Sequence, residues 1–396
     1  MKFKRIFLIV MDSLGVGHAE DAHKFNDEGS NTFYHVNEAM KYLNIPNLEK
    51  LGVGYLDDYN GINKPKDFKG YIGRLKERSN GKDTMTGHWE MMGLYIEKPF
   101  KTFTDTGFPK ELLDEFTRRT GKEIIGNISA SGTKIIEDLG EEHMRTGKLI
   151  IYTSADSVLQ IAANEATCPI DELYKYCEIA RDITMKDEWK VGRIIARPFI
   201  GTSKDNFKRT ARRHDYALSP FDKTYMNVLK DKGYDVVAVG KINDIFNTEG
   251  VTEAIKTVSN VDGMQKTIEI AKNKDFNGLC FVNLVDFDAV YGHRNDVDGY
   301  ANALSEFDAW LETFIKNLKQ NDILIITGDH GCDPSTKSTD HSREYTPMLI
   351  YGNNVKEGVN LGVLDSFADI SATVLEYLGV DKGDTAGCSF LSKVIK

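Results

Sequence analysis

Long apolar runs are absent from this sequence of 396 residues. No stretch approaches the roughly 20 consecutive apolar residues that cross a bilayer. The N-terminus places Lys2, Lys4 and Arg5 before the apolar run Ile6–Met11. A signal peptide has an apolar region of about 7–15 residues and a small-residue cleavage site, whereas this run stops early, at Asp12. We therefore expect Ile6–Met11 to be a buried strand, and we expect no membrane partner.

Cysteines are few and lack the spacing of a metal or disulfide framework. The chain has five, an odd number, with no CxxC pair: Cys168, Cys177, Cys280, Cys332 and Cys388. A zinc ribbon or a disulfide-stapled scaffold is not indicated, and a reducing cytoplasm is the expected location.

An excess of basic residues is also missing. The 60 acidic residues outnumber the 50 basic ones, which gives a formal charge of -10. This balance argues against a nucleic-acid partner. It leaves room for a small anionic substrate, because the local charge of a site can oppose the global balance. The composition, 41% hydrophobic and 28% charged, excludes a disordered, collagen-like or coiled-coil chain.

Short apolar runs alternate with helical patterns along much of the chain. The runs predict buried, parallel strands at Ile6–Met11, Asp235–Val239, Leu279–Val285, Ile323–Thr327 and Met348–Tyr351. Apolar residues at helical spacing predict helices over Phe221–Lys232, Asp298–Lys319 and Phe367–Leu378. The first helix would take its cap and first-turn proline from Ser219-Pro220. This alternation favours an α/β core with a central, mostly parallel sheet flanked by helices.

The middle of the chain differs from this pattern. It has a helix candidate at Glu111–Arg119 and extended runs at Lys148–Thr153 and Arg193–Ile200. It also carries a basic cluster: Arg193, Arg197, Lys204, Lys208, Arg209, Arg212 and Arg213. The cluster is either an ordinary solvated surface or a positive face that attracts an anionic substrate. We expect residues 101–219 to be a smaller α+β cap domain inserted into a core formed by residues 1–100 and 220–396.

Acidic and histidine side chains follow three of the predicted strands. They are Asp12, then Asp286, Asp288 and His293, then Asp329, His330 and His341. A single aspartate there is more often a turn former or helix cap, and a single histidine a satisfied polar residue. Clusters at equivalent strand ends instead favour a ligand site, because open α/β sheets bind ligands outside those ends. Mixed carboxylate and imidazole ligands suit Mn, Zn, Fe or Mg, and their number fits a two-metal phosphoryl-transfer site.

A glycine-bounded loop offers a nucleophile for such a site. The segment Gly81–Glu90 contains Thr84 and Thr86 beside His88. A threonine hydroxyl near metal ions is a competent nucleophile. The alternative is that Asp83-Thr84 simply caps a helix. Both roles are compatible, since a helix N-terminus also favours bound phosphate.

These motifs resemble those of the metalloenzymes of the alkaline phosphatase superfamily. The resemblance is carried by Asp12, the run Asp-Thr-Met-Thr-Gly-His from Asp83, Asp288–His293, Gly328–Gly331 and His341. Within the superfamily the sequence is most similar to the phosphopentomutases, through Lys82–Glu90, Arg213–Ala217 and Thr336–Pro347. The similarity runs from end to end and includes the cap.

The resemblance implies an alkaline-phosphatase-like core and a set of site residues. Asp12, Asp329 and His330 would hold one metal, and Asp288, His293 and His341 the other. The expected ions are two Mn²⁺, with other divalent cations as alternatives. Thr84 would carry the phosphoryl group. Substrate-binding residues would be Ser154, Asp156, Val158, Arg193, Ile195 and Lys241.

The implied activity is the interconversion of ribose 1-phosphate and ribose 5-phosphate, and of the 2-deoxyribose phosphates. Phosphothreonine would donate its phosphoryl group, form a pentose 1,5-bisphosphate and recover the other phosphoryl group, with a sugar bisphosphate as the priming activator. Two alternatives stay open. One is a phosphatase, phosphodiesterase or cofactor-independent phosphoglycerate mutase, and the other is a non-catalytic metal-dependent binding protein.

Overall fold

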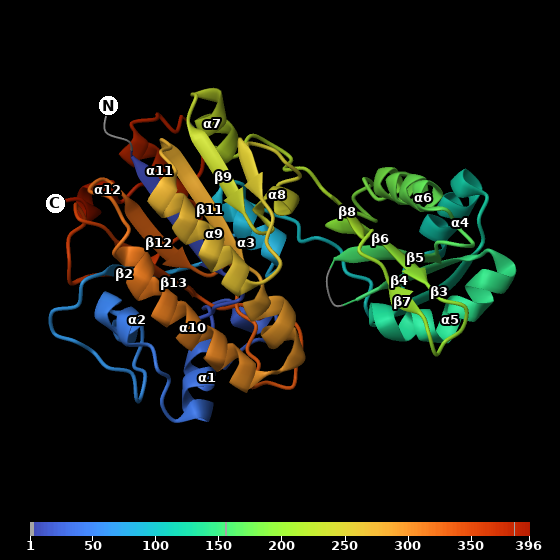
Figure 1. The fold of residues 1–396 in the computed structure, drawn as a ribbon, viewed down its shortest axis with the longest axis horizontal. Coiled ribbons are helices and arrows are strands. Elements are labelled where there is room, and N and C mark those ends of the chain that lie inside the picture. The colour runs from blue at the N-terminus through green and yellow to red at the C-terminus, as the bar shows by residue number, and fades with distance from the viewer. Residues whose placement is uncertain (1–3, 155–156, 384) are drawn as a thin grey trace. The chain divides into compact units, whose positions relative to one another are not determined.

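The computed structural model describes residues 4–154, 157–383 and 385–396, in two compact units (Figure 1). The larger unit combines the chain up to Lys98 with Pro220–Lys396, and the smaller unit is Pro99–Ser219. Each unit has its own sheet and its own hydrophobic core.

An eight-stranded mixed sheet forms the centre of the larger unit, in the order β10-β9-β11-β1-β12-β13-β2-β14. The neighbours from β10 to β12 pair in parallel, as do β2 and β14. The sheet is therefore mostly parallel, as the sequence predicts. The strands are β1 (Arg5–Met11), β2 (Tyr71–Leu75), β9 (Asp235–Val239), β10 (Glu253–Ile255), β11 (Gly278–Leu284), β12 (Ile323–Thr327), β13 (Thr346–Tyr351) and β14 (Val359–Leu364).

The direction of one strand differs from the prediction. Met348–Tyr351 lies in β13, which runs antiparallel to both β12 and β2. The prediction of a parallel strand is wrong here because a parallel neighbour needs a long crossover connection, usually a helix. The segment from Gly328 to Tyr345 contains no helix and leads from the end of β12 into its neighbour β13.

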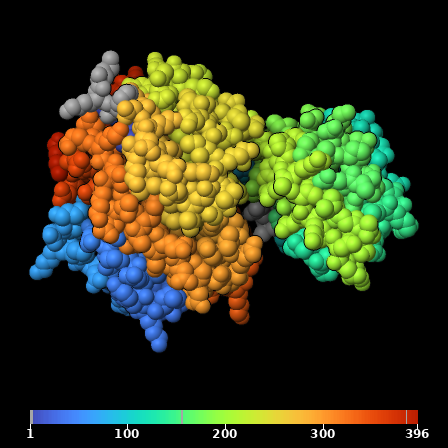
Figure 2. Space-filling model, in the orientation of Figure 1, coloured from blue at the N-terminus to red at the C-terminus, as the bar shows by residue number. Residues whose placement is uncertain are grey.

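Helices cover both faces of this sheet. One face carries α1 (Thr32–Met40), α2 (Pro46–Leu51), α9 (Asn260–Asn273) and α10 (Val297–Ile315), of which α9 and α10, gold to orange, cover much of the surface in Figure 2. The other carries α3 (Thr84–Met91), α7 (Tyr225–Asp231), α8 (Ile242–Ile245), α11 (Ala368–Leu378) and α12 (Leu391–Val394). Short 3-10 turns lie at Ala22–Lys24 and Val53–Tyr55. Within the described ranges, no helix has the length and apolar character of a bilayer span.

Strand β1 shows why the apolar runs are continuous. Phe7 packs edge-on against Phe314 of α10, with ring centroids 5.2 Å apart. Its neighbour Ile6 lies on the opposite face, among residues of α11 and α12 such as Val374 and Val394. Because alternate residues of a strand face opposite sides, a strand buried on both sides is apolar throughout.

The helix predicted from Phe221 begins later than expected. Its N-cap is Thr224, whose hydroxyl accepts a hydrogen bond from the Asn227 amide, while the Asn227 side chain accepts one from the Thr224 amide. This capping box satisfies two amide groups that the helix leaves unpaired. Ser219-Pro220 therefore lies outside the helix, and the prediction that it caps the helix is wrong.

The smaller unit is built on a six-stranded sheet in the order β3-β4-β5-β6-β7, with β8 also paired to β6. Its strands are β3 (Ile124–Ser129), β4 (Leu149–Thr153), β5 (Val158–Asn164), β6 (Arg193–Ile200), β7 (Lys208–Arg209) and β8 (His214–Ala217). Helices α4 (Lys110–Thr120) and α6 (Ile170–Ile183) pack on one face and α5 (Gly132–Thr146) on the other. The predicted elements Glu111–Arg119, Lys148–Thr153 and Arg193–Ile200 match α4, β4 and β6 to within one residue at each end.

A buried ion pair fastens the start of β1. The fully buried guanidinium of Arg5 binds both carboxylate oxygens of Asp322, at 3.0 and 2.5 Å, and also the carbonyl oxygens of Ala271 and Lys274. We expect Arg5→Met to lower the free energy of unfolding by about 3–5 kcal/mol, because it leaves the Asp322 charge buried and unpaired. Urea denaturation measures this change. The double variant Arg5→Met/Asp322→Leu should recover most of the loss, and equal losses in both variants would contradict this account.

Candidate metal centre

Three adjacent strands bring acidic residues to one edge of the larger sheet. Strand β1 lies between β11 and β12 and pairs in parallel with both. Asp12 follows β1, Asp288 follows β11 and Asp329 follows β12. The exposed fractions of these residues are 0%, 6% and 0%. Parallel pairing therefore places three buried carboxylates side by side at the carboxyl ends of the strands, where open α/β sheets bind ligands.

The first group of side chains is Asp12, Asp329 and His330. One ligand atom from each lies within 4.8 Å of the others. The Nε2 atom of His330 is 3.5 Å from Asp12 Oδ1 and 3.3 Å from Asp329 Oδ2. This is a donor set of two carboxylates and one imidazole, which suits hard or borderline divalent cations.

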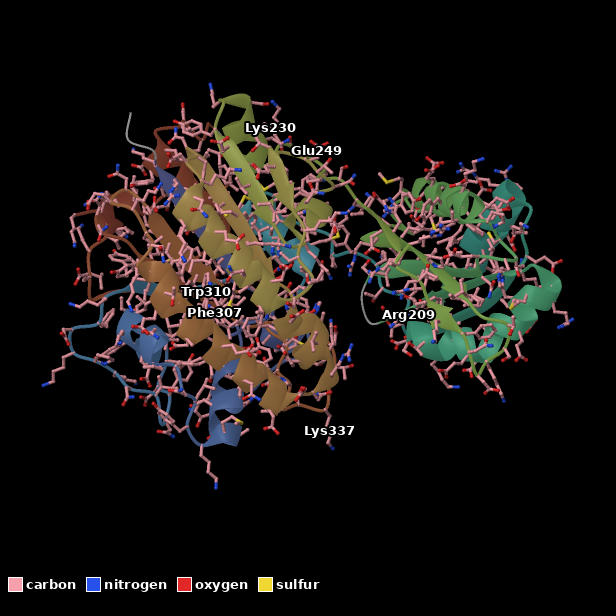
Figure 3. All side chains as sticks on the ribbon, in the orientation of Figure 1. Arg209, Lys230, Glu249, Phe307, Trp310 and Lys337 are labelled. Atoms are coloured by element: carbon pink, nitrogen blue, oxygen red, sulfur yellow. The ribbon has the colours of Figure 1, made fainter. Side chains whose placement is uncertain are left out.

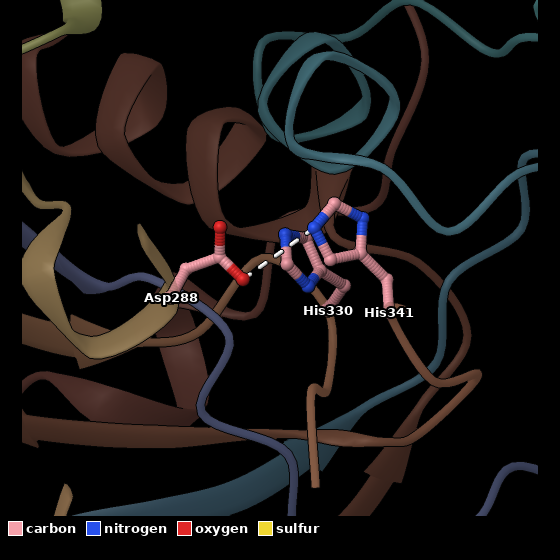
Figure 4. A group of neighbouring side chains, drawn as sticks. All are labelled: Asp288, His330 and His341. Atoms are coloured by element: carbon pink, nitrogen blue, oxygen red, sulfur yellow. Dashed lines mark ion pairs between the residues drawn. The ribbon is translucent and has the colours of Figure 1, made fainter. Parts of the chain in front are cut away.

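The second group is centred on Asp288. A π-helical turn (Phe287–Tyr291) and a 3-10 turn (Gly292–Arg294) bring His293 beside it, with Nε2 at 3.2 Å from Asp288 Oδ2. His341, from the loop before β13, has its Nε2 atom 3.4 Å from Asp288 Oδ1 and 3.1 Å from His293 Nε2. Asp288, His330 and His341 also form a group within 4.8 Å, so His330 connects the two sets (Figure 4).

The chemistry of this cluster fits bound cations. Oδ1 of Asp12, Oδ1 of Asp288 and Oδ2 of Asp329 are buried and accept no hydrogen bond of good geometry from the described residues, although histidine nitrogens lie 3.1–3.5 Å away. Buried carboxylate oxygens without partners are costly unless a cation is present. The imidazoles show the same demand for positive charge: burial opposes protonation, yet the neighbouring Asp288 raises the pKa of His293 to about 12. Burial and the nearby Asp329 raise the pKa of Asp12, which reflects the repulsion between carboxylates.

Thr84 reaches this cluster from the first residue of α3. Asp83 caps the helix, and its Oδ1 atom accepts hydrogen bonds from the amides of Met85 and Thr86. The half-buried Thr84 places its hydroxyl 3.2 Å from Nε2 of His330. Gly87 allows the close approach, since a Cβ atom there would lie 2.2 Å from the Asp329 carbonyl oxygen. Asp83 therefore caps a helix whose first residue stands at the cluster.

Two polar residues that support the cluster were not singled out from the sequence. Asn283 of β11 donates to Asp12 Oδ2 at 2.7 Å, so the other oxygen of Asp12 stays available. His88 is fully buried, with Nδ1 at 2.9 Å from the Thr84 carbonyl oxygen and 3.1 Å from Asp329 Oδ2. The available signal for Asn283 was a single amide within the apolar run Leu279–Val285. His88 ends the run Asp-Thr-Met-Thr-Gly-His from Asp83, but the sequence assigns it no role.

Cys332 was also missed as a neighbour of this centre. Its sulfur groups with Asp288 and His293 within 4.8 Å. Burial raises the pKa of the Cys332 thiol. Because the five cysteines include no CxxC pair, the sequence predicts no metal site that contains Cys332. Its position two residues after His330 was the available signal.

A buried arginine ties the Thr84 loop to the His341 loop. Arg343 donates to the carbonyl oxygens of Ser79 and Gly81 and forms an ion pair with Glu77 at 2.7 Å. Its amide donates to Asp27, which also pairs with Lys82. These contacts hold the segments before Thr84 and after His341 in one arrangement.

The substrate-binding residues expected from the sequence lie in both units. Lys241 lies two residues after the end of β9 and is the N-cap residue of α8 in the larger unit. Ser154, Val158, Arg193 and Ile195 belong to the smaller unit, where Val158 pairs with Arg193 across β5 and β6. Asp156 lies outside the described residues.

Comparisons with known proteins are consistent with this geometry. The model of the Metalloenzyme superfamily matches residues 4–382. A phosphopentomutase of Clostridium tetani is 54% identical over 397 residues and covers 100% of both chains. Among solved structures, the PH0037 protein from Pyrococcus horikoshii has a TM-score of 0.50 at 15% identity and covers 98% of this chain and 100% of its own. The fold is thus the α/β fold of alkaline-phosphatase-like metalloenzymes.

We expect Asn283→Leu to weaken binding of a divalent cation by about 10- to 100-fold, because outer hydrogen bonds orient the ligating carboxylates. Isothermal titration of the metal-free protein with Mn²⁺ measures the affinity. Asn273→Leu, at an exposed site at the end of α9, is the matched control and should bind as the unmodified chain does. Equal affinities in Asn283→Leu and the control would show that Asn283 does not orient Asp12.

Proposed function

We propose a phosphothreonine mechanism for this chain, which belongs to the phosphopentomutases within the Metalloenzyme superfamily. Phosphopentomutase activity is an isomerisation that moves a phosphate between two hydroxyl groups of a pentose. The observation that carries the proposal is the Thr84 hydroxyl, which stands 3.2 Å from His330 Nε2 at the N-terminus of α3. The position of this hydroxyl beside the buried carboxylates and imidazoles supports Thr84 as the nucleophile.

Two divalent cations would be held by the buried carboxylates and imidazoles. Asp12, Asp329 and His330 would bind one, and the second set would be Asp288, His293 and His341. We propose Mn²⁺ for both, since mixed nitrogen and oxygen ligands accept it. The cations would supply charge neutralisation for the phosphoryl group and lower the pKa of an oxygen nucleophile.

Thr84 would act as the phosphoryl carrier in two transfers. In the first, a free hydroxyl of the pentose monophosphate attacks phosphorus, the bond to Thr84 Oγ1 breaks and a pentose 1,5-bisphosphate forms. In the second, Thr84 Oγ1 attacks the other phosphoryl group and releases the isomeric monophosphate. The N-terminal end of α3 favours the negative charge on Thr84. A sugar bisphosphate would prime the enzyme by the same second step.

The predicted cap domain, residues 101–219, lies within the smaller unit. We propose that it acts as a cap inserted into the core. A mutase must keep water from the phosphothreonine, because hydrolysis would waste the phosphoryl group. Ser154, Asp156, Val158, Arg193 and Ile195 would contact the sugar phosphate, with Lys241 from the core. The substrates would be ribose and 2-deoxyribose phosphates.

The rival enzyme functions share the donor cluster but differ in products. A phosphatase or phosphodiesterase would transfer the phosphoryl group to water. A phosphoglycerate mutase would act on a three-carbon acid. The full-length identity of 54% to a phosphopentomutase favours the pentose reaction. A non-catalytic binding protein has no need of a hydroxyl beside His330.

The partition of products separates a mutase from a hydrolase. We expect the protein with Mn²⁺ and a catalytic amount of sugar bisphosphate to convert ribose 1-phosphate mainly to ribose 5-phosphate. Phosphorus NMR follows both esters and free phosphate in one sample. Free phosphate as the main product would exclude the proposed reaction.

The second prediction concerns the carrier itself. Thr84→Val keeps the shape of the side chain and removes the hydroxyl, so isomerase activity should fall by about 10⁴-fold or more, as for other lost nucleophiles. Metal content, measured by mass spectrometry of the eluted ions, should stay unchanged. Thr313→Val, exposed on α10, serves as the control. Full activity in Thr84→Val would refute the assignment.

A further inference from the structure

A half-buried arginine in the smaller unit has no acidic partner among the described residues. Arg197 of β6 donates Nη2 to the neutral Gln160 side chain at 2.6 Å. Its Nε atom is buried and, in the described part of the chain, forms no hydrogen bond of good geometry. Burial lowers the pKa of Arg197, the neighbouring Tyr152 hydroxyl raises it, and the nearby Arg213 and Arg209 lower it. Because the shielded Nε of this guanidinium has neither a hydrogen-bond acceptor of good geometry nor a counter-charge among the described residues, this arrangement favours an anion.

Further donors converge on the same place. The side chain of Tyr152 is 0% exposed, and its hydroxyl also lacks a hydrogen bond of good geometry among the described residues. A Cβ atom on Gly132, the first residue of α5, would lie 2.7 Å from Tyr152 Oη, 3.5 Å from Arg197 Nε and 3.6 Å from Arg209 Nη1. Arg209, labelled in Figure 3, belongs to β7 and is exposed.

The first turn of α5 adds a fourth source of positive potential. The helix has 15 residues, and Ser131 caps it through the Lys134 amide. The remaining amides of a first turn lack intrahelical partners, and the helix end carries a partial positive charge. Two guanidinium groups, a phenol and a helix N-terminus thus surround Gly132.

This place shares a sheet face with the proposed substrate contacts. Tyr152 pairs with Gln160 across β4 and β5, and Gln160 pairs with Ile195 across β5 and β6. Directly paired residues point to the same face of a sheet, and so do residues two apart on one strand. Arg193 and Arg197 therefore flank Ile195 on the face that carries Tyr152.

We propose that Tyr152, Arg197, Arg209 and the first turn of α5 form a binding site for a phosphate monoester dianion. The inference rests on the proposed function and deepens it: the site would hold the phosphate that is not being transferred. Arginine binds phosphate oxygens through two parallel N–H groups, and the phenol and helix amides add single hydrogen bonds.

Two conservative variants test the site without disturbing the core. Tyr152→Phe removes a hydroxyl that has no good partner, so thermal stability should not fall, whereas the KM for ribose 5-phosphate should rise by about 3- to 10-fold. Arg197→Gln should raise KM by about 10- to 100-fold. In both variants kcat should change by less than about 3-fold, since the interaction is equal in ground and transition states.

The control is Arg118→Gln, which removes an exposed arginine of α4 and the same unit of charge. Inhibition by inorganic phosphate is measured together with the KM for ribose 5-phosphate. The comparison distinguishes a site for the phosphate of the substrate from a site for free phosphate. Parallel weakening of phosphate inhibition and of substrate binding supports the proposal. An effect on phosphate inhibition alone would overturn the substrate assignment, and unchanged constants with a lower melting temperature in Tyr152→Phe would overturn the site.

The failure of this site is distinguishable from failure of the phosphothreonine mechanism. The unmodified, Mn²⁺-loaded protein is assayed for isomer against free phosphate in the same experiment. Release of free phosphate would refute the mutase mechanism, while the KM and inhibition shifts of Tyr152→Phe and Arg197→Gln would still test the anion site.

Discussion

Three carboxylates buried side by side at the ends of β1, β11 and β12 impose a need for positive charge on everything around them. Asp12 and Asp329 have no exposed surface, and within the described ranges each keeps one oxygen that accepts no hydrogen bond of good geometry. Divalent cations held by these carboxylates and by the neighbouring imidazoles would satisfy this need. The turns that carry His293 and His341, and the helix that starts at Thr84, are arranged around this one requirement.

The same need for positive charge is linked to which groups of the cluster are buried and which are accessible. The carboxylates and His330 are buried, whereas Thr84 is half-buried. The Thr84 hydroxyl is therefore accessible, while the neighbouring carboxylates and imidazole are shielded from solvent. Shielding strengthens electrostatic interactions at the reacting phosphate. The smaller unit contains the opposite case, since the half-buried Arg197 has no acidic partner among the described residues.

The sequence predicted the features that depend on local pattern. Apolar runs followed within three residues by Asp12, Asp288 and Asp329 identified the strands and the sheet edge at which their carboxyl ends lie. Strand direction cannot be predicted from such a pattern, because the apolar run of β13 is the same for parallel and antiparallel pairing. The connection from β12, which contains no helix, determines the antiparallel direction. Arg197 could not be separated from Arg212 in the basic cluster, since the ion pair of Arg212 with Glu165 and the isolation of Arg197 arise from tertiary packing.

The central claim is that Thr84 carries a phosphoryl group between the two positions of one sugar. Its most direct test is the mass of the intact protein, with peptide mapping, after incubation with Mn²⁺ and a sugar bisphosphate. The account predicts one added phosphoryl group, located on Thr84, that disappears when pentose monophosphate is added and isomer appears. An active isomerase with unmodified Thr84, or with the phosphoryl group on another residue, would contradict it.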